Sequence, residues 1–224
     1  MKIVVLTGAG ISVAAGLRPY RGKGGVWTEQ RVEKVATARA FQQDPSRCAA
    51  FWGNMARAVS CARPTPAHAA LAALERRHEV VIATQNVDGL HQMAGSSQVL
   101  ELHGSMRRWC CGGCNDQGDE QLLAFGPCEC GGWRRPFVVL FDEPLPSAPL
   151  YQARRAAQGA AVFLCVGTSL LVAPASRLPA EARAAGARTV YVGTEAPAQV
   201  NLWNDIRIGR AEDVVPGLVE TFVP

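Results

Sequence analysis

A cluster of polar residues follows a short apolar run near the middle of this 224-residue chain. The run, 80–83, is rich in β-branched residues, which is typical of a buried strand. The cluster reads Thr84-Gln85-Asn86-Val87-Asp88-Gly89-Leu90-His91. Open α/β sheets bind their ligands at the carboxyl ends of strands. Two amides, a carboxylate and an imidazole at such a place suit a sugar and an amide-bearing ring, so the pattern indicates a nucleotide enzyme.

A histidine stands at the end of the next apolar run. His103 follows residues 99–102 and precedes Gly104, which places it at the same expected sheet edge. Histidine titrates near neutral pH, so it can accept a proton there. We interpret His103 as a candidate general base; the alternative is a packed histidine. We expect His91 to orient the polar loop, and His68 and His78, in an alanine-rich stretch, to be structural.

A glycine-rich turn occurs near the start of the chain. Gly8-Ala9-Gly10 lies between a predicted strand and a helix that we expect to begin near Ser12. Glycine lets backbone approach a phosphate, and a helix N-terminus presents N–H groups to it; the alternative is a tight turn. The usual dinucleotide fingerprint needs a third glycine where this chain has Val13, and no acidic residue closes a second strand. A dehydrogenase is therefore disfavoured, but we still expect a nucleotide as the ligand.

Four of the eight cysteines form two close pairs, Cys111 with Cys114 and Cys128 with Cys130. Four thiolates match tetrahedral zinc, and a closed shell of this kind leaves no position for a catalytic water. The pattern predicts a structural zinc site, because free or disulfide-paired cysteines fit glycine-flanked pairs poorly. Cys110 could compete as a ligand. The remaining cysteines are interpreted as small core residues, at Cys48, Cys61 and Cys165.

Short apolar runs alternate with helical stretches along most of the chain. The predicted strands are 2–7, 80–83, 99–102, 137–141, 161–166 and 189–192. The predicted helical stretches are 32–58, with Asp44-Pro45-Ser46 as a helix start, 64–78, 174–185 and 213–222. This alternation predicts an α/β fold with a mostly parallel, doubly wound sheet, into which the cysteine-rich segment is inserted.

Composition argues against several classes of protein. Hydrophobic residues make up 48% of the chain, enough for a core, and the net charge of +4 is too mild to indicate nucleic-acid binding. No apolar run approaches the ~18 residues of a membrane span. The chain enters a predicted strand directly after Met1-Lys2, so we expect no signal peptide. We therefore expect a cytoplasmic location, where clustered cysteines hold metal, and no membrane or nucleic-acid partner.

In this order, the glycine turn, the polar loop, Glu101-Leu102-His103-Gly104, the four cysteines and Gly167-Thr168-Ser169 resemble the sirtuins, which are NAD-dependent protein lysine deacylases. The likeness runs almost from end to end, and 32–57 is most similar to the bacterial branch that includes desuccinylases. The resemblance implies a Rossmann-like NAD-binding domain of residues 1–28, 60–104 and 137–224. The helical insert 29–59 and a zinc module 105–136 would form a smaller domain, with the site between the two.

The resemblance also implies a mechanism with NAD⁺ as co-substrate and a structural Zn²⁺. The oxygen of an acyl-lysine attacks the ribose carbon that bears nicotinamide, and His103 serves as base for the ribose hydroxyls. Asn86 would orient the ribose, and Asp88 would hold the nicotinamide carboxamide. The implied cofactor contacts are Gly8, Ala9, Gly10, Ser12, Gly16, Tyr20, Arg21, Trp27, Gln85, Asn86, Val87, Asp88, Gly167, Thr168, Ser169, Gly193, Glu195 and Ala211. The implied substrate contacts are Trp52, Met55, Val138, Val139 and Phe141.

The chain departs from the family pattern at several positions. Desuccinylating sirtuins carry a Tyr and an Arg three residues apart that can pair with an acidic acyl tail. Here those positions are Trp52 and Met55, so we expect removal of acetyl or longer apolar acyl groups in preference to succinyl. Asp142 replaces a glycine of the segment that pairs with the substrate, Gly193 replaces an asparagine near the adenine-side ribose, and Pro19 replaces Asp or Thr.

Two other functions remain open. The same pocket could transfer ADP-ribose to a protein or hydrolyse NAD, neither of which needs a site for acyl-lysine. A non-catalytic NAD or ADP-ribose sensor with a zinc-bearing interaction surface is the other class. His103 beside Asn86 and Asp88 favours deacylation over both. The sequence does not indicate an oligomeric state or a physiological substrate.

Overall fold

The computed structural model describes residues 1–19, 25, 34–122 and 124–222. In this part of the chain six strands form one sheet in the order β3-β2-β1-β7-β8-β9, and every neighbouring pair is parallel. The strands are β1 (Lys2–Thr7), β2 (Glu79–Thr84), β3 (Val99–Glu101), β7 (Val162–Val166), β8 (Arg188–Gly193) and β9 (Asp205–Ile208). Strand order reverses between β1 and β7, so the predicted doubly wound sheet is confirmed.

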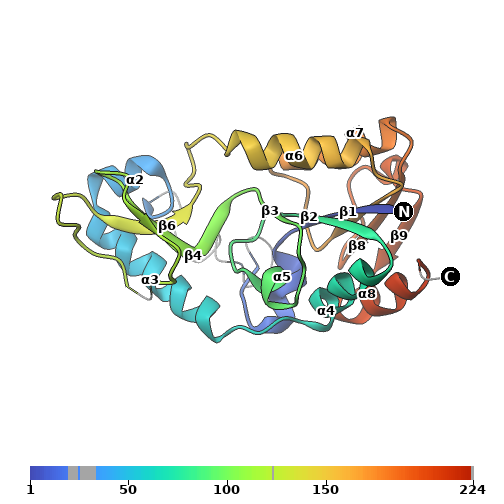
Figure 1. The fold of residues 1–224 in the computed structure, drawn as a ribbon, viewed down its shortest axis with the longest axis horizontal. Helices are drawn as coiled ribbons and strands as arrows, with labels where there is room; N and C mark the ends of the chain where they lie inside the picture. The colour runs from blue at the N-terminus through green and yellow to red at the C-terminus, as the bar shows by residue number, and fades with distance from the viewer. Residues whose placement is uncertain (20–24, 26–33, 123, 223–224) are drawn as a thin grey trace.

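Helices cover both faces of this sheet (Figure 1). Side chains of a strand point alternately to its two faces. Ile3 and Val5 accordingly pack with α4 (Pro66–Ala73) and α8 (Ala211–Glu220) in one apolar cluster. Val4 and Leu6 pack with α6 (Ser147–Gln158) and α7 (Leu178–Ala184) in another. Short 3₁₀ helices adjoin these elements at η1 (Ala9–Ala15), η3 (Leu74–Arg76), η4 (Ala175–Arg177) and η5 (Val200–Leu202).

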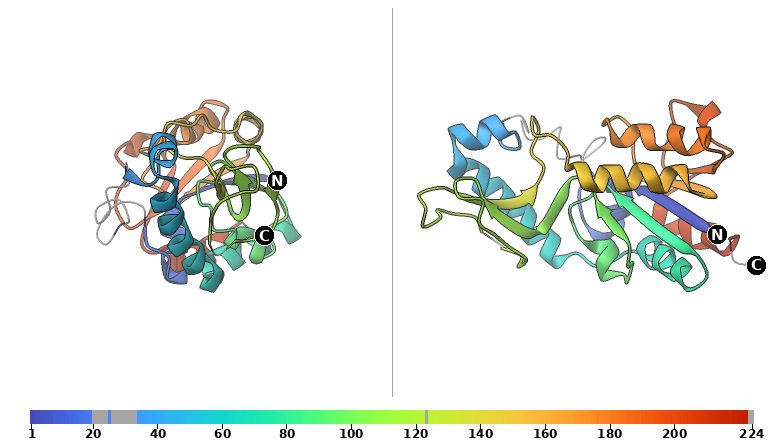
Figure 2. Two further views of the ribbon diagram at one scale, coloured as in Figure 1. Left: turned by 90° about the vertical axis from the view of Figure 1, so that its left-hand side faces the viewer. Right: turned by 45° about the horizontal axis from the view of Figure 1, so that its top comes forward.

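A smaller unit lies at the end of the molecule opposite both termini (Figures 1 and 2). It contains α2 (Ala38–Gln43), α3 (Pro45–Cys61) and an antiparallel sheet in the order β5-β4-β6. Its strands are β4 (Gly104–Cys111), β5 (Gln117–Gly118) and β6 (Arg134–Val138). Helices and sheet share a third apolar cluster that includes Trp52 and Met106. The predicted insert is present, and the domain boundaries stay a prediction.

The start of α3 follows the predicted signal. The Asp44 side chain accepts a hydrogen bond from the Arg47 N–H, and Pro45 occupies the first turn of the helix, where its missing N–H costs nothing. The helix expected near Ser12 is the 3₁₀ helix η1, which begins at Ala9. None of the helices among the described residues has both the length and the apolar character that a membrane crossing requires.

One strand prediction was wrong, and several elements were missed. The run 137–141 was expected to be a strand, but β6 spans Arg134–Val138 and pairs with β4 rather than with the main sheet. The apolar run continues past the strand because Leu140 is buried in the small unit's cluster. The sequence patterns gave no signal for several elements, among them β4, β9, α6 and α5 (Leu90–Met93).

Candidate functional site

Three loops meet at the carboxyl edge of the main sheet, where the strand order reverses. They follow β1, β2 and β7, and a reversal of this kind opens the crevice in which α/β sheets bind ligands. The Gln85 side chain joins two of the loops, because its Nε2 donates to Thr168 Oγ1 at 2.9 Å. The Gln85 backbone N–H donates to the Thr7 carbonyl at 2.9 Å. The structure therefore brings the three motifs together at this edge.

The glycines of the first loop are explained by a close contact with the third. Gly10 N–H donates to the Gly167 carbonyl at 2.8 Å, and a Cβ on Gly10 would lie 2.7 Å from Gly167 Cα. Gly8 N–H donates to the Val166 carbonyl at 3.1 Å. These two N–H groups are therefore engaged within the protein, so small size is what the fold requires at Gly8 and Gly10. Their binding of a phosphate stays a prediction.

Asn86 is held by its amide nitrogen. Its Nδ2 donates to the Gly8 carbonyl at 3.0 Å and to Ser12 Oγ at 3.3 Å, which uses both amide hydrogens. The amide oxygen is left to accept, since it has no hydrogen-bond partner among the residues that the structure describes. A group fixed in this way can accept a hydrogen bond from a ribose hydroxyl.

Asp88 is a buried carboxylate with two donors from the protein. Its Oδ2 accepts from Ser12 Oγ at 2.8 Å and its Oδ1 accepts from Leu90 N–H at 2.9 Å. Burial raises the pKa of Asp88, and the bonds from Leu90 and Ser12 oppose that rise. An ionised carboxylate offers about four acceptor positions, so two remain for a ligand such as a carboxamide.

His103 lies against the polar loop, as predicted. Its Nδ1 is 2.9 Å from the Gln85 carbonyl oxygen, which can only accept, so Nδ1 carries the proton and Nε2 keeps its lone pair. Burial lowers the pKa of His103, and the bond to Gln85 opposes that change only in part. The imidazole is therefore neutral near pH 7, as a general base must be.

Gly104 is required by the backbone next to this histidine. Its φ is +80°, in the left-handed region, and a Cβ there would collide with the carbonyl oxygen of Phe137 on β6. The Val139 N–H in turn donates to the His103 carbonyl at 2.9 Å. The His-Gly pair is thus the point at which the chain passes from the main sheet to the small one.

The predicted substrate residues share one apolar region. Trp52, Met55, Val138 and Phe141 belong to, or pack against, the apolar cluster of the small unit, together with Val87 of the polar loop. Trp52 is only 5% exposed. Arg57, two residues beyond Met55, is exposed and donates to the Asn54 side chain. Two arginines pack on other aromatic members of the cluster, Arg134 at 5.2 Å from the centroid of the Trp109 ring and Arg135 at 5.9 Å from that of Phe41.

Two departures from the family pattern have a visible setting. Asp142 has a φ of +74°, a conformation that suits the glycine usually found there. At Gly193 the space for a side chain is taken, because a Cβ would lie 2.5 Å from the phenol oxygen of Tyr191. The Tyr191 ring packs on Trp203 at 5.2 Å between centroids, which keeps it in that place.

The other predicted cofactor residues are spread along the same edge and beyond it. Ser169 and Glu195 are exposed, Ala211 is buried at the start of α8, and Gly16 ends η1 in a left-handed conformation. Ala9 is half-buried in η1. The predictions for Tyr20, Arg21 and Trp27 lie outside the described residues.

The four predicted zinc ligands converge. Their Sγ atoms all lie within 4.8 Å of one another, with Cys111 and Cys130 at 3.5 Å and Cys114 and Cys128 at 3.9 Å. Zn–S bonds of about 2.3 Å in a tetrahedron place sulfur atoms about 3.8 Å apart, so the cluster fits zinc. Gly113 and Gly132 N–H groups point at Cys111 and Cys130 Sγ, which favours thiolates. Cys110 is not in the cluster.

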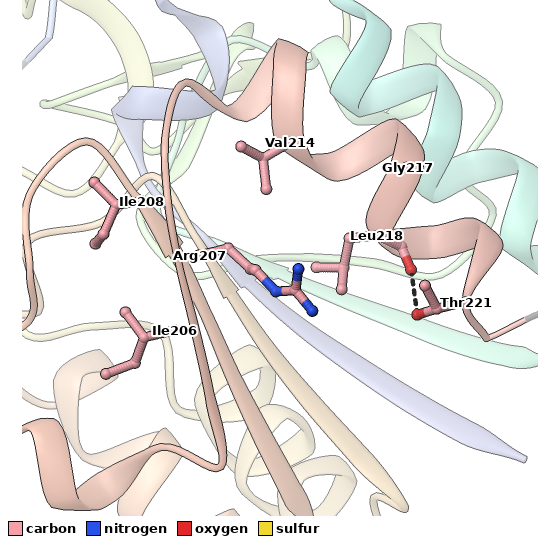
Figure 3. Close-up of a pocket in the computed structure, with 7 residues that line it drawn as sticks. All are labelled: Ile206, Arg207, Ile208, Val214, Gly217, Leu218 and Thr221. Carbon is pink, nitrogen blue, oxygen red and sulfur yellow. Dashed lines mark hydrogen bonds between the residues drawn. The ribbon is translucent and has the colours of Figure 1, made fainter.

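A surface hollow lies away from these residues. A hollow of ≈ 390 Å³ lies between β9 and α8, lined by Ile206, Arg207, Ile208, Val214, Gly217, Leu218 and Thr221 (Figure 3). None of the predicted site residues lines it. The candidate site is therefore defined by converging polar groups and not by this hollow.

Comparison with known families settles the classification. The model of the Sir2 family matches residues 8–174. The chain belongs to the Sir2 family. Among its relatives, NAD-dependent protein deacylase 2 of Pyrobaculum aerophilum is 43% identical, over 97% of this chain and 89% of the relative. NAD-dependent protein deacylase 2 of Archaeoglobus fulgidus is 41% identical over the same shares.

Solved structures of Sir2 proteins have the same fold. A Sir2 homologue in complex with NAD superposes with a TM-score of 0.91 and 35% identity, over 98% of this chain and 88% of that one. A structure described as a basis for the mechanism and regulation of Sir2 enzymes gives a TM-score of 0.88 and 39% identity, over 98% and 91%. The family resemblance and the Rossmann-like fold are confirmed. The position near the bacterial desuccinylase branch stays a prediction.

Several residues that the sequence did not point to support the loops of the site. Thr7 closes β1 and Thr65 precedes α4, and both bond to buried histidines. Arg135 pairs with Glu143 at 2.8 Å, and Glu143 also accepts the Leu140 N–H, so this pair shapes the loop after β6. A threonine at a strand end or an arginine in a basic pair is too common to be noticed in a single sequence.

Zinc removal tests the cysteine cluster. We expect Cys114→Ser to lose the bound zinc and to lower the free energy of unfolding by about 3 kcal/mol or more, because metal binding at such sites is coupled to folding. Zinc content by atomic absorption and urea denaturation are the measurements. Cys110→Ser is the matched control and should keep one zinc per chain; equal zinc loss from both variants would contradict the assignment.

Proposed function

We propose that this chain removes acyl groups from lysine side chains of proteins, with NAD⁺ as co-substrate, and gives nicotinamide and O-acyl-ADP-ribose. The observation that carries the proposal is the neutral His103 imidazole bonded to the Gln85 carbonyl, directly beside Asn86. The names of the relatives, NAD-dependent protein deacylases and deacetylases, support it. So does the NAD bound by a structural relative with the same fold.

The residues at the sheet edge fit the nicotinamide half of NAD⁺. NAD⁺ supplies an electrophilic ribose carbon that releases nicotinamide. Asn86 presents its amide oxygen to the ribose hydroxyls, because both hydrogens of its Nδ2 are held by Gly8 and Ser12. Asp88 holds the carboxamide through acceptor positions that Ser12 and Leu90 leave open. The two side chains thereby fix which face of the sugar is open to attack.

His103 moves the proton in this scheme. Its Nε2 lone pair takes a proton from a ribose hydroxyl while Nδ1 stays bonded to Gln85. The Gln85 carbonyl then stabilises the positive charge that forms on the ring, much as an acceptor behind a catalytic histidine does. The base is thus oriented by backbone, and its tautomer does not depend on another side chain.

The apolar cluster supports a preference for acetyl or longer apolar acyl groups over succinyl. A succinyl chain ends in a carboxylate, and an unpaired carboxylate in an apolar site costs several kcal/mol. Trp52 and Met55 stand where desuccinylating relatives have charge-pairing and hydrogen-bonding side chains, and both lie in or against that cluster. A cytoplasmic location also stays a prediction, and a reducing compartment would suit a site made of four thiolates.

ADP-ribosyl transfer or NAD hydrolysis is the second candidate. It would use Asn86 and Asp88 in the same way but would not need the apolar region around Trp52 and Val138. The position of that region next to Val87, and the Val139 bond to the His103 carbonyl, favour deacylation. Release of nicotinamide in the absence of any acylated peptide would favour hydrolysis instead.

The reaction products test the function. We expect the unaltered protein to turn NAD⁺ and acetyl-lysine peptide into O-acetyl-ADP-ribose, detected by mass spectrometry. His103→Ala should lower the rate by about 10²–10⁴-fold, the usual contribution of a positioned base, with NAD binding retained. Equal rates before and after the substitution would remove His103 from the mechanism.

The pH profile of kcat/KM tests the state of the base. The active form of His103 is neutral, and its pKa is lowered from 6.5 by burial. The rate should therefore rise with pH through a midpoint below 6.5 and be level by about pH 7. Circular dichroism at each pH checks that the fold persists. A midpoint above pH 7 would mean that the pKa of the base is raised and not lowered, and would contradict the assignment of a buried, neutral His103 as the base.

Acyl preference tests the apolar pocket. We expect deacetylation to exceed desuccinylation by about 100-fold or more, because Trp52 and Met55 offer the succinate charge no partner. A Trp52→Tyr and Met55→Arg double variant should narrow that ratio by raising desuccinylation. A Trp52→Phe and Met55→Leu double variant, which keeps the pocket apolar, is the control. Faster desuccinylation by the unaltered protein would refute the preference.

A further inference from the structure

Two buried histidines lie beneath the candidate site, and neither takes part in the proposed reaction. The rings of His68 on α4 and His91 on α5 are 4.7 Å apart between centroids, and the two residues are 0% and 1% exposed. Burial lowers the pKa of His68 to about 4, and burial with the neighbouring His68 lowers that of His91 to about 3. Both rings are therefore neutral at pH 7.

His91 is tied to both strands that deliver the first two loops. Its Nε2 is 2.9 Å from Thr7 Oγ1, at the end of β1, and Thr7 Oγ1 donates to Thr84 Oγ1, at the end of β2, at 2.9 Å. Thr84 Oγ1 also accepts the Asn86 N–H at 3.0 Å. The residue that ends the polar loop is thereby connected, through a neighbouring strand, to the residue that begins it.

Counting protons fixes the direction of this chain of bonds. A hydroxyl has one hydrogen, and that of Thr7 is used toward Thr84, so Thr7 must accept from His91. Neutral His91 consequently carries its proton on Nε2. Loss of this donor would leave the Thr7 hydroxyl free to turn away from Thr84, and with it the acceptor that holds the Asn86 backbone.

His68 packs against the ring of His91 and is itself tied to the loop after β1. Its Nδ1 accepts the Thr65 N–H at 3.2 Å, and Thr65 Oγ1 donates to the Ile11 carbonyl at 3.2 Å. Ile11 adjoins Ser12, the residue that donates to Asp88 and accepts from Asn86. The two rings, whose planes are inclined at 59°, thus lie between the loop after β2 and the 3₁₀ helix after β1.

The two buried histidines make the fold less stable than a pair of apolar side chains in the same places would. His68 Nε2 and His91 Nδ1 are buried and have no hydrogen-bond partner among the described residues, and an unsatisfied buried polar atom is unfavourable. Leucine or phenylalanine at either position would avoid this cost. What an apolar side chain could not supply is the bond to Thr7 or the acceptor for Thr65.

We infer that His91 is a positioning residue for the reaction: through Thr7 and Thr84 it sets the backbone of the turn that presents Asn86 and Asp88, while His68 fixes its ring. The expected effect on the reaction rate rests on the proposed function, whereas the expected effect on NAD binding does not. The effect is on the geometry of the ribose site, where small displacements are expensive.

The test compares three substitutions at His91 and Thr7. His91→Phe keeps the ring but removes the donor, and should lower kcat/KM for NAD⁺ about tenfold and weaken NAD binding in calorimetry by a similar factor. His91→Gln carries an N–H₂ near the place of Nε2 and should recover most of the loss. Thr7→Val should match His91→Phe, and the double variant should be no worse than either, since all break one chain of bonds.

His78 provides the matched control. It is half-buried, its Nε2 bonds to the Phe222 carbonyl, and its Nδ1 is also unpaired among the described residues, but it lies outside the site. His78→Phe should change the free energy of unfolding without changing KM or binding of NAD⁺. The inference is overturned if His91→Phe behaves in the same way, if Gln does not rescue, or if the His91 and Thr7 effects add.

A failure of the proposed function would give a different set of results from a failure of the role assigned to His91. If the unaltered protein binds NAD⁺ but deacylates no peptide, the proposed function fails, and the calorimetric comparison of the same variants still decides the role of His91. If the unaltered protein does not bind NAD⁺, both are rejected.

Discussion

The backbones of two loops touch at the centre of the sheet's carboxyl edge, and the rest of the site is arranged around this contact. Gly10 and Gly167 approach so closely that neither position has room for a side chain. The contact fixes the Gly8 carbonyl and the Thr168 hydroxyl, which are the partners of Asn86 and Gln85 on the loop after β2. The amides are therefore placed by glycine backbone, and any side chain at the contact would displace all three loops.

The sequence predicted the elements that are buried on both faces. Residues 80–83 and 161–166 are continuous apolar runs because central parallel strands are covered by helices on each side. β9 has the sequence Asp205-Ile206-Arg207-Ile208 and lies at an edge, half-exposed, so it lacks that signature. The run 137–141 was wrongly predicted to be a strand for the opposite reason. Its apolar character comes from packing in a loop beyond the strand.

Some residues of the candidate site could likewise be predicted from the sequence, and others could not. Side chains with unusual chemistry for their place, such as Asp88 and His103, could be found in the sequence because a strand end rarely needs them for packing. The supporting contacts could not. Thr7 looks like any β-branched strand residue, and its partner His91 is 84 positions away. Only the register of β1 with β2, which pairs Thr7 with Thr84, brings the three together.

The site is organised by hydrogen bonds between neutral groups, with Asp88 as the exception. Several ion pairs lie far from the site, as with Lys2 and Glu79 or Arg154 and Glu181, whereas Arg135 and Glu143 pair beside the loop after β6 and make no contact with the His103 ring that the structure records. A buried ion pair near His103 would bring a large desolvation cost and would bias the pKa of the base. Backbone acceptors avoid both effects, because the Gln85 carbonyl orients the imidazole without adding a full charge.

His103 also joins the two parts of the molecule. Its side chain is held by Gln85 of the main sheet, while its carbonyl accepts from Val139 beside the small sheet. Gly104, with its left-handed backbone, then turns the chain into β4. A movement of the small unit would therefore act directly on the backbone of the base. Since Val138 and Phe141 of the apolar region belong to that same unit, the position of the base and the shape of the acyl site are set by one structural element.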